Sequence, residues 1–137
     1  MKVTGLTIDP FTNMPIVILK DEADQTALPI WIGLVEASAI ATELEKIKLS
    51  RPMTHDLLKN ILDEVSIRVD RVVLDDLSDN TFYAKIFLKQ NGEEWMLDSR
   101  PSDAIAISLR TKAAIFVEKE VIQKSRKIDL SKEPQQK

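Results

Sequence analysis

The chain has 137 residues, of which 44% are apolar and 30% charged, a composition typical of one folded globular domain. It has no Cys and a single His, His55, which excludes thiol catalysis, Cys-ligated metals and sites that need two imidazoles. The formal net charge is −3, and residues 1–117 hold 13 basic against 18 acidic side chains, so no broad basic surface for nucleic acid is expected. No apolar run is long enough to cross a bilayer and the chain begins with no signal-like segment. The sequence therefore predicts a cytoplasmic protein without membrane contact.

The first half of the chain contains apolar strand-like segments followed by segments of helical period. β-branched and apolar residues predict three strands, and turn residues between the first two indicate a hairpin. The strands are expected at 3–8, 14–19 and 28–33. Apolar residues then recur at helical spacing and predict helices over about 34–48 and from Thr54 to Val65. One face of the second helix carries its apolar residues, Leu57, Leu58, Ile61, Leu62 and Val65.

The second half predicts three more strands, a buried helix and a short last strand. The three strands are expected near 66–74, near 81–89 and through 95–97. An acidic loop over 75–80 joins the first two, and Asn91-Gly92 predicts a type I′ turn before the third, because both residues tolerate a positive φ. Residues 104–111 are apolar nearly all round, so this helix is predicted to lie inside the fold. Residues 114–117 follow as a strand.

These elements together predict a single α+β domain. The expected order is βββααβββαβ(α), with an antiparallel or mixed β-sheet packed with three to four helices. The domain is expected to cover residues 1–125. The polar residues 126–137 are expected to form a disordered tail.

A polar segment joins the third strand of the second run to the buried helix. It contains Asp98, Ser99, Arg100, Ser102 and Asp103. Free backbone N–H groups and the helix dipole would attract an anion here, and the Arg100 guanidinium would clamp a phosphate beside Ser99 and Ser102. The carboxylates of Asp98 and Asp103 are suitable ligands for Mg²⁺ or Mn²⁺. The alternative is a helix cap, in which Ser99 or Ser102 satisfies free N–H groups and Asp103 complements the dipole.

A second Arg-Pro segment precedes the second helix. Within it, His55 can act as a general acid or base near neutral pH, Asp56 can orient the imidazole, and Arg51 can hold a phosphate. The alternative is again a helix cap: Thr54 caps the helix, Asp56 complements its dipole, and His55 is solvated.

Four segments of the chain carry a specific combination of motifs. They are 28–33 (LPIWIG), 36–41 (EASAIA), 51–58 (RPMTHDLL) and 98–106 (DSRPSDAIA). In this order they resemble the bifunctional nuclease domain family, which has bacterial and plant members. The resemblance covers roughly residues 1–125 and implies an α+β domain with nuclease activity on DNA and RNA.

The residues and the resemblance lead to one functional hypothesis, hydrolysis of phosphodiester bonds. In it, His55, Asp98 and Asp103 are catalytic: Mg²⁺ or Mn²⁺ on the two carboxylates activates water, His55 carries the proton, and Arg51 and Arg100 bind phosphate. The alternative is a non-enzymatic module that binds a small anionic ligand or a protein partner, because a fold does not fix a function. The expected partners are DNA or RNA, bound weakly and locally, and a second copy of the chain in a homo-oligomer.

Overall fold

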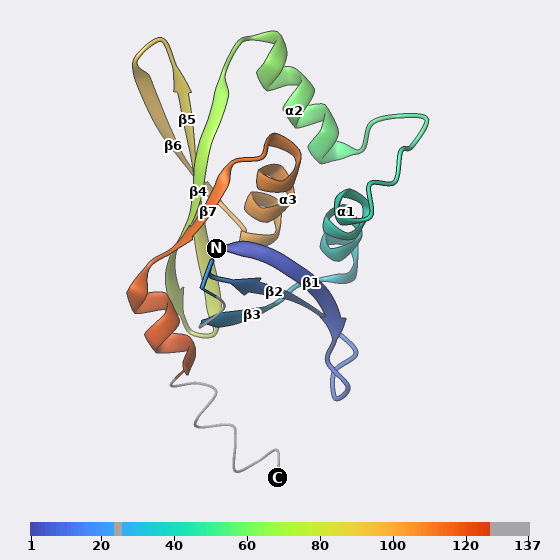
Figure 1. The fold of residues 1–137 in the computed structure, drawn as a ribbon, viewed down its shortest axis with the longest axis vertical. Coiled ribbons are helices and arrows are strands. Elements are labelled where there is room, and N and C mark those ends of the chain that lie inside the picture. The colour runs from blue at the N-terminus through green and yellow to red at the C-terminus, as the bar shows by residue number, and fades with distance from the viewer. Residues whose placement is uncertain (24–25, 127–137) are drawn as a thin grey trace.

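Two antiparallel three-strand runs, each followed by helices, make up most of the fold (Figure 1). The structure is a computed structural model and describes residues 1–23 and 26–126. Its elements are β1 (Lys2–Ile8), β2 (Pro15–Lys20), β3 (Ala27–Trp31), α1 (Leu34–Leu44), α2 (Thr54–Glu64), β4 (Arg68–Ser78), β5 (Thr81–Gln90), β6 (Glu93–Ser99), α3 (Pro101–Thr111) and β7 (Ala114–Val117). Residues 119–126 are also helical. The predicted α+β class and element order are confirmed.

The strands are divided between two sheets. β1, β2 and β3 form a three-stranded antiparallel sheet in that order. The second sheet has the order β6-β5-β4-β7, with β7 parallel to β4 and the other pairs antiparallel. Figure 1 shows α3 in the middle of the molecule, where it contacts α1, α2, β4 and β5.

The core of the fold is built around α3. Its residues 104–107 are buried, as their unbroken apolar sequence predicts. The helix begins earlier than predicted, at Pro101, because proline at the first helical position has a suitable φ and needs no hydrogen-bond donor there. Other fully buried core side chains come from both sheets, α1 and the C-terminal helix. They include Leu19, Leu28, Ile30, Ile40, Leu74 and Val121.

Tight turns close both hairpins of the second sheet. Asn91 and Gly92 have φ of 49° and 83°, which confirms the predicted turn. The β4–β5 turn is shorter than predicted: residues 75–78 continue β4, and only Asp79 and Asn80, with φ of 51° and 63°, form the turn. A short turn of this type suits both residues, because Asn and Asp tolerate a positive φ.

The α2 helix forms where predicted, but its apolar face is not in the core. Leu57, Leu58, Ile61 and Val65 are between 43% and 51% exposed, and only Leu62 of the predicted stripe packs against the core. The helix has no fully buried residue. Its N-terminal end contacts α3 through His55 and Asp56, so polar contacts and Leu62, and not the whole apolar stripe, join this helix to the rest of the fold.

The C-terminal prediction is only partly within the described chain. Arg126 belongs to the C-terminal helix, and residues 127–137 of the predicted tail lie outside the described residues. In the part of the chain that the structure describes, no helix has the length and hydrophobicity needed to span a bilayer.

Candidate functional site

The N-terminal ends of α2 and α3 meet, and this contact brings the two polar segments together. His55 Nε2 lies 2.9 Å from Asp103 Oδ1, across 48 residues of sequence. His55 is on the first turn of α2, and Asp103 is on the first turn of α3. A partly buried imidazole and carboxylate in contact form a pair that can exchange or position a proton.

The Arg100 guanidinium also contacts the Asp103 carboxylate. Its Nε lies 2.8 Å from Asp103 Oδ2, and its second terminal nitrogen, NH2, lies 3.1 Å from Oδ1, a two-point contact that fixes the carboxylate plane. The other terminal nitrogen, NH1, lies 3.5 Å from Oε1 of Glu36 at the start of α1. We call Glu36, His55, Arg100 and Asp103 the Asp103 cluster. It draws one side chain from α1, one from α2, one from α3 and one from the residue that precedes α3.

These contacts change the acidity of Asp103. Burial alone would raise the pKa of its carboxyl, but hydrogen bonds and charge from Arg100 and His55 outweigh burial and lower the pKa below its usual range. Asp103 is therefore a carboxylate at neutral pH, with a charge held in place by two cationic or proton-donating partners.

The free energy of unfolding is expected to decrease at acidic pH because Asp103 becomes protonated. A carboxyl with a lowered folded-state pKa stabilises the fold above its unfolded value of about 3.9, and this contribution is lost as the pH falls through the lower native value. Asp103→Asn should flatten the decline in unfolding free energy between about pH 5 and pH 2. Urea unfolding at a series of pH values measures this. Asp63→Asn, which changes an exposed carboxyl on α2, is the control and should decline as the wild type does. An unchanged decline in the Asp103 variant would contradict the assignment.

The remaining predicted site residues have other surroundings. Asp98 is exposed on β6, where its Oδ1 lies 3.3 Å from Lys85 Nζ on the neighbouring strand. Asp98 and Asp103 thus belong to different ion pairs. Among the described residues, no group of three or more His, Asp or Glu side chains has an arrangement suited to a metal ion.

The two serines predicted to bind phosphate lie within two residues of Arg100 in the chain but do not cap α3. Ser99 Oγ donates to the Arg100 carbonyl at 2.8 Å, and Ser102 is buried at the second position of α3. Arg51 is exposed in the loop before α2 and has no hydrogen-bond or ion-pair partner among the residues described.

The predicted hydroxyl caps are wrong for both helices. Thr54 is already helical, and the capping position before it is Met53, whose N–H donates to Asp56 Oδ2 at 3.0 Å. Arg100 occupies the same position before α3, where no side chain caps the helix. Asp56 and Asp103 instead place a carboxylate on each first turn, where negative charge is favourable, and of the two only Asp56 accepts a backbone N–H there.

A buried arginine that the sequence reading did not single out lies next to the cluster. Arg110 Nε lies 2.6 Å from Asp56 Oδ1, and its terminal nitrogens donate at 3.0 Å to the carbonyls of Ala39 and Ala106. Asp56 therefore pairs with Arg110, and the residue that contacts the His55 imidazole is Asp103. The sequence does contain a signal for this contact: Arg110 is a single basic residue in a helix that is apolar nearly all round, and such a residue needs a buried partner.

A pocket of about 280 Å³ adjoins the cluster. It lies between the end of β3, the start of α1, the β4–β5 turn and the start of α3, and Glu36, Arg100 and Ser102 are among its lining residues. A larger open hollow of about 690 Å³ is lined by residues of β4, β5 and β7, such as Arg71 and Phe87, and not by the cluster. The smaller pocket thus places a concave surface beside the exposed face of Arg100.

Comparison with known proteins identifies the chain's relatives. The family model described as the bifunctional nuclease domain matches residues 17–129, a stretch that contains both polar segments. The chain belongs to the bifunctional nuclease domain family. An uncharacterized protein of Mycobacterium tuberculosis is 35% identical over 122 residues, which is 89% of this chain and 73% of that protein. The predicted resemblance is therefore confirmed.

Plant relatives carry the nuclease name. Bifunctional nuclease 1 of Arabidopsis thaliana is 28% identical over 119 residues, which is 84% of this chain and 37% of the plant protein. Bifunctional nuclease 2 of Oryza sativa subsp. japonica is 26% identical over 117 residues, which is 82% and 36% of the two chains. This bifunctional nuclease domain thus corresponds to little more than a third of each plant protein.

Proposed function

We propose that this domain hydrolyses phosphodiester bonds of DNA or RNA at the Asp103 cluster. The observation that carries the proposal is the 2.9 Å contact between His55 and Asp103, with Arg100 on the same carboxylate. It supplies the three parts that hydrolysis of a phosphodiester needs: a proton-transfer group, a residue that positions it, and a cation for the phosphate. Membership of the bifunctional nuclease domain family supports the choice of substrate class.

His55 is the proton-transfer group in this proposal. When Nε2 donates its proton to Asp103, the other ring nitrogen, Nδ1, is an acceptor. Nδ1 takes a proton from water while the water oxygen bonds to phosphorus. The bond from phosphorus to one ester oxygen then breaks, and solvent protonates the departing oxygen. Asp103 is a positioning residue, since its Oδ1 holds the imidazole ring in place.

Arg100 and Arg51 are the proposed phosphate contacts. Arg100 is exposed and lines the pocket, so a phosphate oxygen can reach its terminal nitrogens while the Nε contact with Asp103 persists. Arg51 lies four residues before His55. It has no hydrogen-bond or ion-pair partner among the described residues, so binding a phosphate would break no such contact. Cations placed here would stabilise the charge that develops on the phosphate oxygens.

Metal dependence remains a prediction. Asp98 pairs with Lys85 and Asp103 pairs with Arg100. The steps above therefore use only protein groups. Mg²⁺ or Mn²⁺ bound through one of these carboxylates would supply charge neutralisation or a more acidic water.

A second candidate function is binding of a small anion without hydrolysis. It is favoured by the pocket of about 280 Å³ beside Arg100, which is smaller than a typical ligand site and far smaller than a nucleic-acid groove. This module would bind inorganic phosphate or a mononucleotide and release it unchanged.

Cleavage assays distinguish the two functions. Highly purified wild type, Asp103→Asn and Asp63→Asn would be incubated with single- and double-stranded DNA and RNA in Mg²⁺, in Mn²⁺ or in EDTA. We expect wild type and Asp63→Asn to cleave equally, and Asp103→Asn to lose about 10²-fold through misplacement of His55. Equal cleavage by all three proteins would show a contaminating nuclease. Binding of mononucleotide without cleavage would favour the second function.

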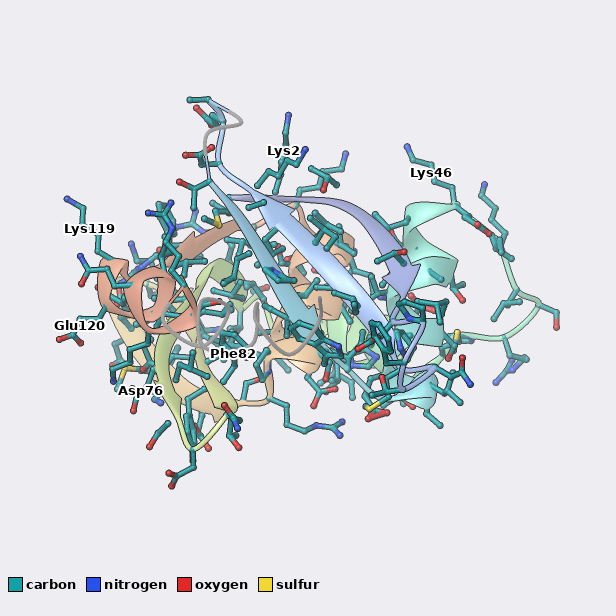
Figure 2. All side chains as sticks on the ribbon, turned by 90° about the horizontal axis from the view of Figure 1, so that it is seen from below. Lys2, Lys46, Asp76, Phe82, Lys119 and Glu120 are labelled. Carbon is teal, nitrogen blue, oxygen red and sulfur yellow. The ribbon has the colours of Figure 1, made fainter. Side chains whose placement is uncertain are left out.

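Nucleic-acid affinity is expected to depend weakly on salt. Figure 2 shows Lys2, Lys46 and Lys119 on separate parts of the fold. Residues 1–117 also hold 13 basic against 18 acidic side chains, so we expect few phosphates to be neutralised together. The slope of log affinity against log salt should have a magnitude of about 2–4, and Arg100→Ala should reduce it by about 1. Lys119→Ala is the control and should leave it unchanged. Fluorescence anisotropy at several salt concentrations measures the slope, and a magnitude of about 8 would place the binding surface elsewhere.

A further inference from the structure

β6 forms one outer edge of the four-stranded sheet. β5 pairs with one side of β6 from Glu93 to Ser99, and no strand of the described chain pairs with the other side (Figure 1). An outer strand directs backbone N–H and C=O groups away from its sheet, where they can pair with another strand. Six of the seven residues of β6 are exposed.

This edge has acidic residues near its ends but lacks several other features that prevent pairing. β6 contains no proline or lysine, and its register with β5 runs without a bulge. Three large apolar residues stand in its middle: Trp95, Met96 and Leu97 are 37%, 61% and 50% exposed. An edge strand with a regular register and an exposed apolar centre is a favourable surface for strand addition.

The opposite edge of the same sheet is different. β7 has only four residues, and the amino group of Met1 donates to the Ile115 carbonyl on that strand. The helix over 119–126 begins directly after it. The edge most open to pairing is therefore β6.

We infer that β6 pairs antiparallel with β6 of a second copy of this chain, about a two-fold axis at Met96. The two four-stranded sheets then continue into one sheet of eight strands. In this register Met96 faces the partner's Met96, and Trp95 faces the partner's Leu97 on the same side of the sheet. Aromatic and aliphatic residues directly opposite each other are favourable cross-strand pairs, and each apolar residue of one copy finds an apolar residue of the other.

Charges near the ends of β6 are compatible with this register. Glu94 would face the partner's Asp98, a like-charge pair that would be unfavourable between isolated carboxylates. Each carboxylate already has cations beside it: Glu94 lies within 3.7 Å of Arg71 and Lys89, and Asp98 lies 3.3 Å from Lys85. The two facing carboxylates would thus each keep a cation of their own sheet beside them, which offsets part of their repulsion. The inference does not depend on the proposed function.

The first test is the oligomeric state. Light scattering after size exclusion should give the mass of two 15.5 kDa chains for the wild type and of one chain for Trp95→Lys, because a lysine here would place charge in the joint. Phe116→Lys changes a half-exposed apolar residue on β7 and is the matched control, which should stay dimeric. Unfolding curves for each variant show that a monomer is folded.

The second test fixes the register and does not depend on the lysine variant. The chain has no cysteine, so a single introduced cysteine reports on one contact. Met96→Cys should form a disulfide-linked dimer under mild oxidation, since directly opposite residues lie within disulfide reach. Trp95→Cys and Phe116→Cys should not. A monomeric wild type would overturn the inference. So would a dimer that persists in Trp95→Lys and fails to cross-link through Met96→Cys, an outcome that would point to another surface, such as the exposed apolar face of α2.

Discussion

Replacing Arg110 with methionine is expected to lower the free energy of unfolding by about 3–5 kcal/mol. The Arg110 side chain is only 2% exposed and binds three acceptors, the Asp56 carboxylate and the carbonyls of Ala39 and Ala106. It therefore ties α1, α2 and α3 together at one point. Methionine fills a similar space but removes the cation from Asp56, which keeps only the Met53 N–H as a hydrogen-bond donor among the described residues, and breaking charge-assisted contacts that join three helices is costly. Urea unfolding at neutral pH measures the loss.

Two further variants decide whether the pairing causes this loss. Arg68→Met is the matched control, because Arg68 is 73% exposed and its nearest carboxylate, on Asp70, is 3.9 Å away. We expect a change below about 0.5 kcal/mol there. The double variant Arg110→Met/Asp56→Leu should recover part of the stability, since removing both charges avoids leaving one unpaired. A loss below about 1 kcal/mol in Arg110→Met would show that the three contacts contribute little.

Elements set by local signals were predictable from the sequence. Asn91-Gly92 specifies a tight hairpin because both residues accept a positive φ, and the unbroken apolar run 104–107 specifies a buried helix. These signals act within a few residues of the chain. They give the order of strands and helices, but they do not say that β1–β3 and β4–β7 form separate sheets, which depends on pairing between distant segments.

The orientation of α2 was not predictable from its own sequence. Its apolar stripe favours burial, yet contacts from His55 to Asp103 and from Asp56 to Arg110 turn a different face toward α3. Both contacts join residues about fifty positions apart, so a reading of helical period cannot detect them. The structure thus replaces a hydrophobic explanation of this helix with a polar one.

The sequence predicted which residues form the candidate site, but it did not predict which of them contact one another. The sequence placed His55, Arg100 and Asp103 at helix N-termini, and the fold brings all three into contact. It also grouped Asp98 with Asp103, five positions along the chain. The β6 strand ends between them, and strand geometry directs Asp98 toward Lys85 on β5 instead. Proximity in sequence is a poor guide where a strand changes to a helix.

Replacing His55 with glutamine is expected to lower kcat for phosphodiester cleavage by about 10²–10⁴-fold and to leave KM nearly unchanged. A glutamine amide can donate to Asp103 as the imidazole does, but it cannot take a proton from water. Its effect should therefore fall on the chemical step. Arg100→Ala should instead raise KM and lower kcat, because the guanidinium would contact phosphate both before and during the reaction. Steady-state kinetics on a short labelled oligonucleotide measure both parameters.

The pH dependence of the wild type and of His55→Gln separates proton transfer from a structural role of His55. If His55 accepts a proton in the reaction, kcat of the wild type should rise with pH through the imidazole titration, and His55→Gln should lose this rise together with its rate. A variant that merely loosened the contact between α2 and α3 would keep the shape of the wild-type profile at a lower rate. Unfolding curves of His55→Gln supply the matching structural measurement. A profile of unchanged shape, or a kcat within about 3-fold of wild type, would remove His55 from the proposed mechanism, because general acid–base catalysis contributes far more than that.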